Sequence, residues 1–150
     1  KGIAQEAALK VLELTAGEIV ALFDTPMGFR HGPKSVVDDD TLCVLFLSDD
    51  PRTRRYEMDV LKELYRDKKG GSLIAITASA EEEVKRHCDL MICMGCRVKA
   101  ANSQLAPVYI TVAQILALLY SMKLGITPDD PCPSGEVNRV VQGVTIYEED

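Results

Sequence analysis

The stretch "TLCVLFLSDDPRTRRYEMDVLKELYRDKKGGSLIAITAS", residues 41–79, decides the fold class. Its first eight residues form an almost uninterrupted apolar run, which is typical of a parallel strand covered on both faces. Asp50 and Pro51 then supply a helix cap and a first-turn proline, and Gly70-Gly71 ends the helical pattern. A second apolar run follows at 72–79. The stretch therefore predicts a strand, a helix and a parallel strand, joined by a right-handed crossover.

The helix inside this stretch is predicted to be amphipathic. We expect one apolar stripe to face the sheet, formed by Met58, Leu61, Leu64 and Tyr65.

The flanking segments continue the alternation of helix and strand. Residues 3–15 have the spacing of an amphipathic helix, and the Ile- and Val-rich segment 18–23 indicates a strand. Further elements are predicted after residue 79: an acidic helical stretch at 81–86, a third apolar strand at 90–95, and a helix that opens at Pro107 and ends at Leu124. Residues 1–126 thus predict an α/β domain whose parallel sheet is flanked by helices, and residues 127–150 predict an ordered C-terminal arm.

The helix predicted at 107–124 is apolar on nearly all sides. Such a helix must be covered on several sides, either by the core or by another subunit, and we expect a homo-oligomer, a dimer. The apolar run at 105–119 is interrupted by Pro107, Thr111 and Gln114, so it falls short of a membrane span.

Composition excludes several functional classes. With 17 basic and 23 acidic residues the net charge is −6, so the chain has no basic field to attract nucleic acid or an anionic membrane. The five cysteines are an odd number and no signal-like segment opens the sequence, which predicts a reduced, cytoplasmic protein. Zinc is often bound by cysteine and histidine, and four such residues lie close together in the sequence: His87, Cys88, Cys93 and Cys96. Side chains alternate between the two faces of the strand predicted at 90–95, which would separate these residues, so we expect no metal site.

Two residues are candidates for proton transfer. His31 is a candidate because histidine is the residue type that can donate or accept a proton near neutral pH, and Arg30 and Lys34 make its loop locally basic, which would suit a phosphorylated substrate. The alternative is a surface histidine beside the Gly32-Pro33 turn. Glu13 stands near the end of a helix, where an acidic side chain opposes the helix dipole, although a pair with Lys10 would explain it equally well.

Three blocks together resemble the second sugar isomerase (SIS) domain of the tagatose-6-phosphate ketose/aldose isomerases, also described as galactosamine-6-phosphate deaminase/isomerases. The blocks are "AALKVLELTAG" (7–17), the segment at 28–64 with its "HGP" loop, and "GITPDDPCPSGEVNRVVQGVTIY" (125–147). The resemblance implies a flavodoxin-like three-layer domain whose first strand is missing ahead of Lys1. It also implies the second of two SIS domains, the C-terminal portion of a protein about two and a half times longer, with the phosphate loop in the other domain.

The resemblance also implies chemistry. In the wider family, which includes the isomerase domain of glucosamine-6-phosphate synthase, the catalytic glutamate and histidine match Glu13 and His31. His31 would open the sugar ring, and Glu13 would carry a proton between C2 and C1 without metal or cofactor. The synthase lysine near the sugar is matched by Gln142, which can hydrogen-bond an oxyanion but supplies no charge.

Three hypotheses follow for function. The first is part of an aldose-ketose isomerase or deaminase acting on hexosamine or hexose 6-phosphates. The second is a non-catalytic SIS module that senses a sugar phosphate, and the third is a scaffold for dimerisation. Retention of both Glu13 and His31 favours the first.

Overall fold

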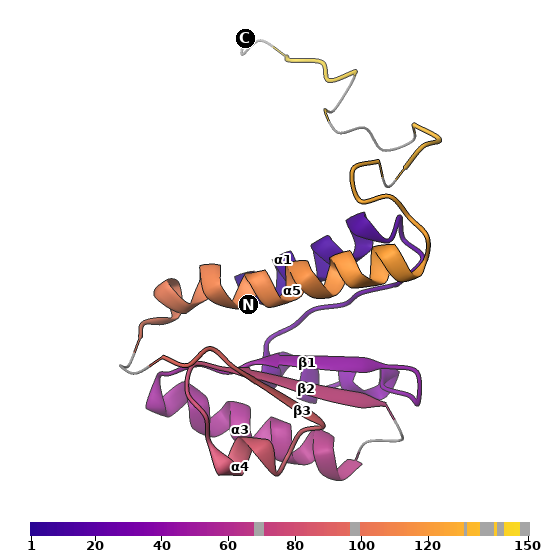
Figure 1. Cartoon of the computed structure of the whole chain (residues 1–150). Coiled ribbons are helices and arrows are strands. Elements are labelled where there is room, and N and C mark those ends of the chain that lie inside the picture. The colour runs from indigo at the N-terminus through magenta and orange to yellow at the C-terminus, as the bar shows by residue number, and fades with distance from the viewer. Residues whose placement is uncertain (68–70, 97–99, 131, 136–139, 141–142, 148–150) are drawn as a thin grey trace.

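The computed structural model describes residues 1–67, 71–96, 100–130, 132–135, 140 and 143–147. These residues form a three-layer α/β body (Figure 1). A parallel sheet lies in the middle, one layer of helices covers each face, and the segment that follows Gly125 leads away from the body. The fold class predicted from the sequence is confirmed.

The central sheet contains β1 (Leu42–Phe46), β2 (Ser72–Thr77) and β3 (Leu90–Cys93), in the order β1-β2-β3. Both neighbouring pairs are parallel, with Val44 beside Ile74 and Ile76 beside Ile92. The crossovers run through α3 (Pro51–Asp67) and α4 (Glu82–Lys85), as the caps and apolar runs predicted. Asp50 caps α3 by accepting the backbone N–H of Thr53 at 2.8 Å.

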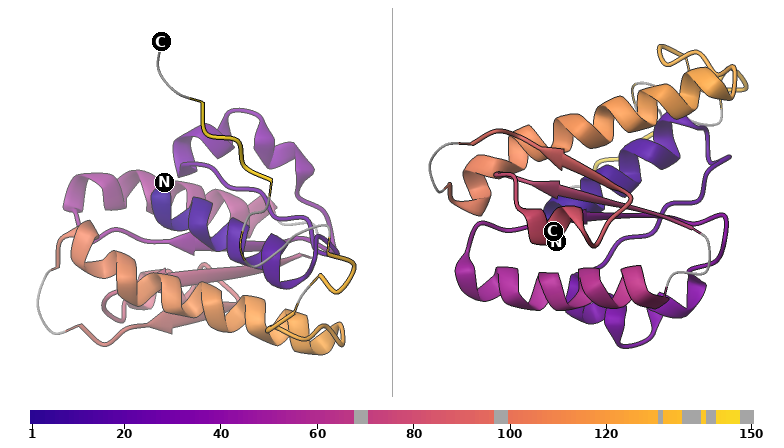
Figure 2. Two further views of the ribbon diagram at one scale, coloured as in Figure 1. Left: turned by 90° about the horizontal axis from the view of Figure 1, so that it is seen from above. Right: turned by 60° about the horizontal axis from the view of Figure 1, so that its bottom comes forward.

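Helices α1 (Gly2–Leu14) and α5 (Asn102–Lys123) pack side by side on one face of the sheet, and α3 and α4 cover the other face (Figure 2). The core is accordingly divided in two. On the α3 side it includes Leu61, Leu64 and Leu73, and on the α5 side Ile76 and Leu105. Burial on both faces explains why the strands are apolar along their whole length.

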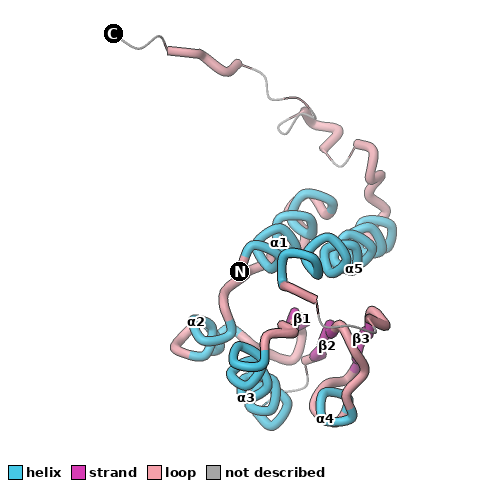
Figure 3. The backbone as a smooth tube through the Cα atoms, turned by 90° about the vertical axis from the view of Figure 1, so that its left-hand side faces the viewer, coloured by secondary structure: helices cyan, strands magenta, loops and turns pink. Residues whose placement is uncertain are grey.

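Two short helices follow the loop after α1. The helix α2 (Pro26–Arg30) and the 3₁₀ helix η1 (Pro33–Val36) surround His31. In Figure 3, α2 lies beside α3, in the layer opposite α1 and α5.

The strand predicted at 18–23 is wrong. The helix α1 ends in two consecutive left-handed residues, Ala16 (φ 50°) and Gly17 (φ 78°), and the chain then continues without regular structure to Thr25. Val20 is 77% exposed and Leu22 is 71% exposed. The segment has strand-forming residues, but it pairs with no described strand, and propensity alone does not make a strand.

The predicted start of α5 is also wrong, because the helix begins five residues before Pro107, at Asn102. The Gln104 side chain accepts the Ala101 backbone N–H at 2.9 Å, and the Leu105 N–H donates to the Ala101 carbonyl at 3.1 Å. These bonds start the helix upstream, so the proline lies inside it and removes one backbone donor.

The predicted apolar stripe of α3 is correct at Met58, Leu61 and Leu64 and wrong at Tyr65. Consecutive helical residues differ by about 100° in direction, and the step from Leu64 carries Tyr65 off the buried face. Tyr65 is 38% exposed, and its ring contacts His87 edge-on at 5.9 Å.

One stripe of α5 is buried and its outer face is apolar. The buried residues recur every fourth position: Leu105, Tyr109, Ala113, Ala117 and Ser121. The exposed apolar residues are Val108, Ile115, Leu118, Leu119, Met122 and, just after the helix, Leu124. With 22 residues α5 is long and apolar enough to cross a membrane, so the expectation that this region falls short of a membrane span is not supported by its length and composition. Because its buried stripe packs on α1 and the sheet, we interpret it as a helix of this domain.

Candidate functional site

Glu13 lies in the last turn of α1 and its side chain is 45% exposed. Lys10 Nζ donates to Glu13 Oε2 at 2.6 Å and lies 3.5 Å from Glu6 Oε1. The hydrogen bond that Lys10 donates to Glu13 is the main cause that raises the pKa of Lys10. Lys10 therefore stays positively charged and holds the half-exposed side chain of Glu13 at the end of α1.

His31 is the C-cap of α2 and is exposed. The helix is started by Thr25, whose Oγ1 accepts the Gly28 N–H at 3.0 Å, and its first residue is Pro26. The His31 N–H donates to the Gly28 carbonyl at 3.2 Å. A Cβ added at Gly28 would lie 2.5 Å from Asp24 Oδ1, so a larger residue there would require the Asp24 side chain to move.

Arg30 and Lys34, on either side of His31, both form ion pairs with α3. Arg30 Nε lies 2.7 Å from Glu63 Oε2, and Lys34 Nζ lies 2.6 Å from Glu63 Oε1. Lys34 also contacts Asp67 Oδ2 at 3.0 Å. The hydrogen bond to Glu63 raises the pKa of Lys34, and that of Glu63 is lowered in return. Both predicted phosphate-binding side chains thus already have carboxylate partners.

Apolar contacts attach the same loop to the body. Met27 and Phe29 of α2 pack against the core cluster that contains Leu61 and Leu64 of α3. The loop that carries His31 is therefore held on α3 by apolar contacts from α2 and by ion pairs from either side of the histidine.

The structure places Glu13 and His31 in different layers. The helix that carries Glu13 packs on α5, whereas the helix that ends at His31 packs on α3 (Figure 3). Within the described part of the chain, the carboxylate of Glu13 is bonded to Lys10 and the two side chains are not brought into one pocket. The third predicted region, Gln142, lies outside the described residues.

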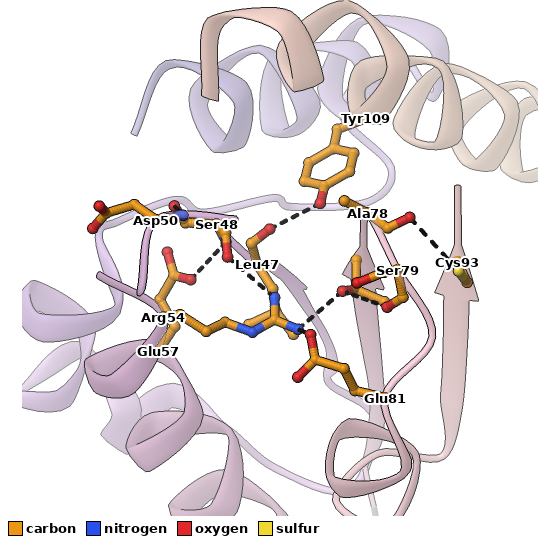
Figure 4. A network of polar contacts seen from close by, with 11 residues as sticks. Leu47, Ser48, Asp50, Arg54, Glu57, Ala78, Ser79, Glu81, Cys93 and Tyr109 are labelled. Carbon is orange, nitrogen blue, oxygen red and sulfur yellow. Dashed lines mark hydrogen bonds and ion pairs between the residues drawn. The ribbon is translucent and has the colours of Figure 1, made fainter. Parts of the chain in front are cut away.

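A polar network that the sequence did not reveal lies where the strands end (Figure 4). Arg54 of α3 donates to Thr77 Oγ1 at 3.0 Å and to Glu81 Oε1 at 2.6 Å. The buried carboxylate of Glu57 accepts the Ser48 N–H at 2.7 Å. Burial raises the pKa of Glu57, the effect expected for a carboxylate withdrawn from water.

The same network attaches α5 to the sheet. Ser48 Oγ donates to Asn102 Oδ1 at 2.8 Å, and Asp49 Oδ2 accepts the Ala100 N–H at 3.1 Å. Deeper in, the Tyr109 hydroxyl donates to the Leu47 carbonyl at 2.8 Å. Ligands of open α/β sheets bind at this end of the strands. Here the described side chains bond mainly to one another, and among them Arg54 Nε is buried without a partner.

The described cysteines are not part of a metal-binding cluster. Within residues 1–67, 71–96, 100–130 and the described part of the arm, no three His, Cys, Asp or Glu side chains are placed to hold a metal ion. None of the five cysteines, all of which lie in the described residues, is in a disulfide, and burial raises the pKa of Cys43 and of Cys88.

The chain belongs to the SIS domain family, whose model matches residues 1–123. This agrees with the three-layer fold and with the "HGP" loop between the first helix and β1.

Known relatives resemble the whole chain. It is 47% identical over 147 residues to the D-galactosamine-6-phosphate deaminase AgaS of Escherichia coli, covering 98% of this chain and 38% of that protein. The tagatose-6-phosphate ketose/aldose isomerase structure from Escherichia coli has a TM-score of 0.83 at 42% identity, covering 98% of this chain and 36% of the other. A candidate isomerase of the same name from Clostridium novyi NT has a TM-score of 0.93 at 48% identity, covering 99% and 38%. The chain thus spans about two fifths of the length of these relatives.

Proposed function

We propose that the complete protein is a phosphosugar isomerase/deaminase that converts a hexosamine 6-phosphate to a ketose 6-phosphate and ammonia. The observation that carries this proposal is the presence of both Glu13 and His31 in a chain 47% identical to a galactosamine-6-phosphate deaminase. Galactosamine 6-phosphate, giving tagatose 6-phosphate, is the substrate we propose, because the relatives' names contain these two sugars.

The proposed reaction needs one acid-base group at the ring oxygen and one at C1 and C2. His31 protonates the ring oxygen while the C1 hydroxyl loses its proton, which gives the open-chain aldehyde. Glu13 takes the C2 proton and returns it to C1, while the C1 oxygen gains a proton and the nitrogen loses one, so the open-chain amino aldehyde becomes a C1 alcohol with an imine at C2. Water adds to this imine and ammonia leaves. Groups of this kind contribute about 10²- to 10⁴-fold each.

Assembly from two copies is part of the proposal. The two proposed acid-base residues lie in different layers of one chain, so a second copy that brings its own His31 near Glu13 would complete the site. The apolar outer face of α5, with Leu119 at 57% and Met122 at 62% exposure, is the surface that we propose contacts that second copy. Covering such a face removes apolar area from water, which stabilises association.

The cytoplasm is the proposed location. The five described cysteines form no disulfide, which supports this location, since disulfides form mainly in oxidising compartments.

An ammonia-release assay on the complete protein tests the activity. Galactosamine 6-phosphate and glucosamine 6-phosphate are compared as substrates, and tagatose 6-phosphate formation is followed in parallel. Glu13→Gln should lower kcat at least 100-fold while binding of the sugar phosphate persists. The matched control is Glu6→Gln, which removes the other carboxylate beside Lys10 and should keep activity.

Two alternatives have distinct outcomes in the same assay. A sensor module would bind sugar phosphate without releasing ammonia, and Glu13→Gln would change nothing. A scaffold would show neither turnover nor binding, while disruption of the α5 face would change assembly.

A further inference from the structure

We propose that Glu63 of α3 is a positioning residue for His31, acting through Arg30 and Lys34. This inference rests on the proposed function. Each oxygen of the Glu63 carboxylate bonds a different cation, at 2.7 Å to Arg30 and 2.6 Å to Lys34. The carboxylate therefore spans the loop, with one contact directly before His31 and one contact three residues after it.

The location of this carboxylate distinguishes it from an ordinary surface ion pair. Isolated exposed pairs add little to stability, because water screens them and long side chains lose freedom. The Glu63 side chain is only 14% exposed and has two partners, from positions 29 and 33 residues earlier in the sequence. Its main effect is therefore to restrict the loop geometry.

The segment between the two contacts has few ways to move. It contains only His31, Gly32 and Pro33, and the proline ring fixes one of the backbone angles. The His31 N–H is bonded to Gly28, and the Ser35 N–H is bonded to the Gly32 carbonyl at 3.0 Å. With both ends held by Glu63, the backbone position of His31 is set relative to α3.

This arrangement gives Arg30 and Lys34 a role other than phosphate binding. A cation that binds a substrate phosphate through a charge-assisted bond must be available to it. Here the described structure gives Arg30 one carboxylate and Lys34 two, since Asp67 also lies 3.0 Å from Lys34. We assign both side chains to anchoring the loop that carries the histidine.

The test is a double-mutant cycle in the complete protein with Glu63→Gln and His31→Asn. Glu63→Gln alone should lower kcat roughly 10- to 100-fold with KM within about threefold, since misplacing a catalytic group by 1 Å can have such an effect. In the His31→Asn background the same change should lower kcat less than twofold, because the residue that it positions is already absent.

The pH profile gives a second readout. Removing the Glu63 charge takes from Arg30 its described carboxylate partner, while Lys34 keeps Asp67, and the added net positive charge beside His31 favours neutral imidazole. Because the proposed role of His31 is to protonate the ring oxygen, the basic limb of kcat/KM should move to lower pH in Glu63→Gln. Glu63→Asp should restore part of the rate.

The control is Glu83→Gln, which breaks another ion pair of α3, the 2.6 Å contact with Lys62, and should leave kcat and the pH profile unchanged. If Glu63→Gln does not fold, the double variant Arg30→Gln/Lys34→Gln removes the same contacts from the loop side and replaces it in the cycle. Circular dichroism and the unfolding temperature establish folding.

The inference is overturned by any of three results. Glu63→Gln could retain wild-type kcat, it could lower kcat equally in both backgrounds, or Lys34→Gln could raise KM tenfold at unchanged kcat, which would indicate phosphate binding. A fully active His31→Asn would instead contradict the proposed function itself, so the two failures are distinguishable.

Discussion

The Tyr109 hydroxyl donates a 2.8 Å hydrogen bond to the Leu47 carbonyl, and so joins α5 to the end of β1 across 62 positions of sequence. Tyr109 is 2% exposed, and burial raises the pKa of its phenol to about 12. Its ring also stacks on Phe46 with centroids 6.2 Å apart. The bond is therefore made in a place where water cannot replace it.

Tyr109→Phe should destabilise the protein by about 1–3 kcal/mol, because the buried Leu47 carbonyl loses its donor. In a protein of this size each kcal/mol lowers the unfolding temperature by about 2–4 °C. Tyr56→Phe, at a ring that is 50% exposed, is the control and should have no effect. Equal unfolding temperatures for both variants would contradict the role of this bond.

Glu57→Gln should remove a pH dependence of stability. Burial raises the pKa of Glu57 above 4.5, so the folded protein holds this proton more tightly than the unfolded chain does. Its contribution is most favourable below pH 4.5 and declines as pH rises through the folded pKa. The amide oxygen of glutamine can still accept the Ser48 N–H, so the variant should equal or exceed the wild-type unfolding temperature at pH 7. A clear drop at that pH would refute this account.

Asp67→Asn should weaken the loss of protein stability at acidic pH. The hydrogen bond from Arg66, and next the one from Lys34, lower the pKa of Asp67 from 3.8 to about 2. Its stabilisation is therefore complete above pH 3.8 and is lost as pH falls to about 2. Thermal unfolding between pH 4 and pH 2 should depend less on pH in the variant, whereas Asp59→Asn on the exposed side of α3 should follow the wild type. If the unfolding temperature changed equally with pH in the wild type and both variants, the ion pairs of Asp67 would not stabilise the fold.

Ala117→Leu should destabilise the packing of α5. Ala117 is 0% exposed, and the larger side chain would have to displace its neighbours, at about 1–3 kcal/mol. Gln114→Leu introduces the same side chain at an exposed position of α5 and serves as the control. If Ala117→Leu were as stable as the control, the buried side of α5 would be able to accommodate the larger side chain.

The double variant Leu119→Glu/Met122→Glu should dissociate the proposed assembly. Two charges in an apolar contact would lose hydration without partners, which disfavours association. Light scattering during size-exclusion chromatography of the complete protein measures the mass. Val20→Glu changes a more exposed apolar residue elsewhere and should preserve the assembly. If the double variant keeps the wild-type mass, α5 is not the contact surface.

The elements predicted correctly from the sequence depend on local signals. The strand at 41–48, the capped helix and the strand at 72–79 were recognisable because apolar runs and caps are short-range features. The segment 18–23 carried the same kind of signal, yet strand formation also requires a neighbouring edge, which no local pattern reveals.

The candidate residues show the same limit. Glu13 and His31 were identified from local sequence blocks, while the partners of Arg30 and Lys34 depend on how α3 is placed against the loop. Glu57 carried a weak signal, since an acidic residue sits directly beside the apolar stripe that starts at Met58. Glu63 gave no comparable sign, because its partners lie about thirty positions away.

The shared carboxylate of Glu63 has a practical consequence for protein engineering. A chimaera that exchanges the histidine loop alone between two members of the family would separate the loop from its anchor. Swapping residues 26–36 together with positions 63 and 67 would transfer one self-consistent module, so these distant parts of the chain should be recombined as a unit.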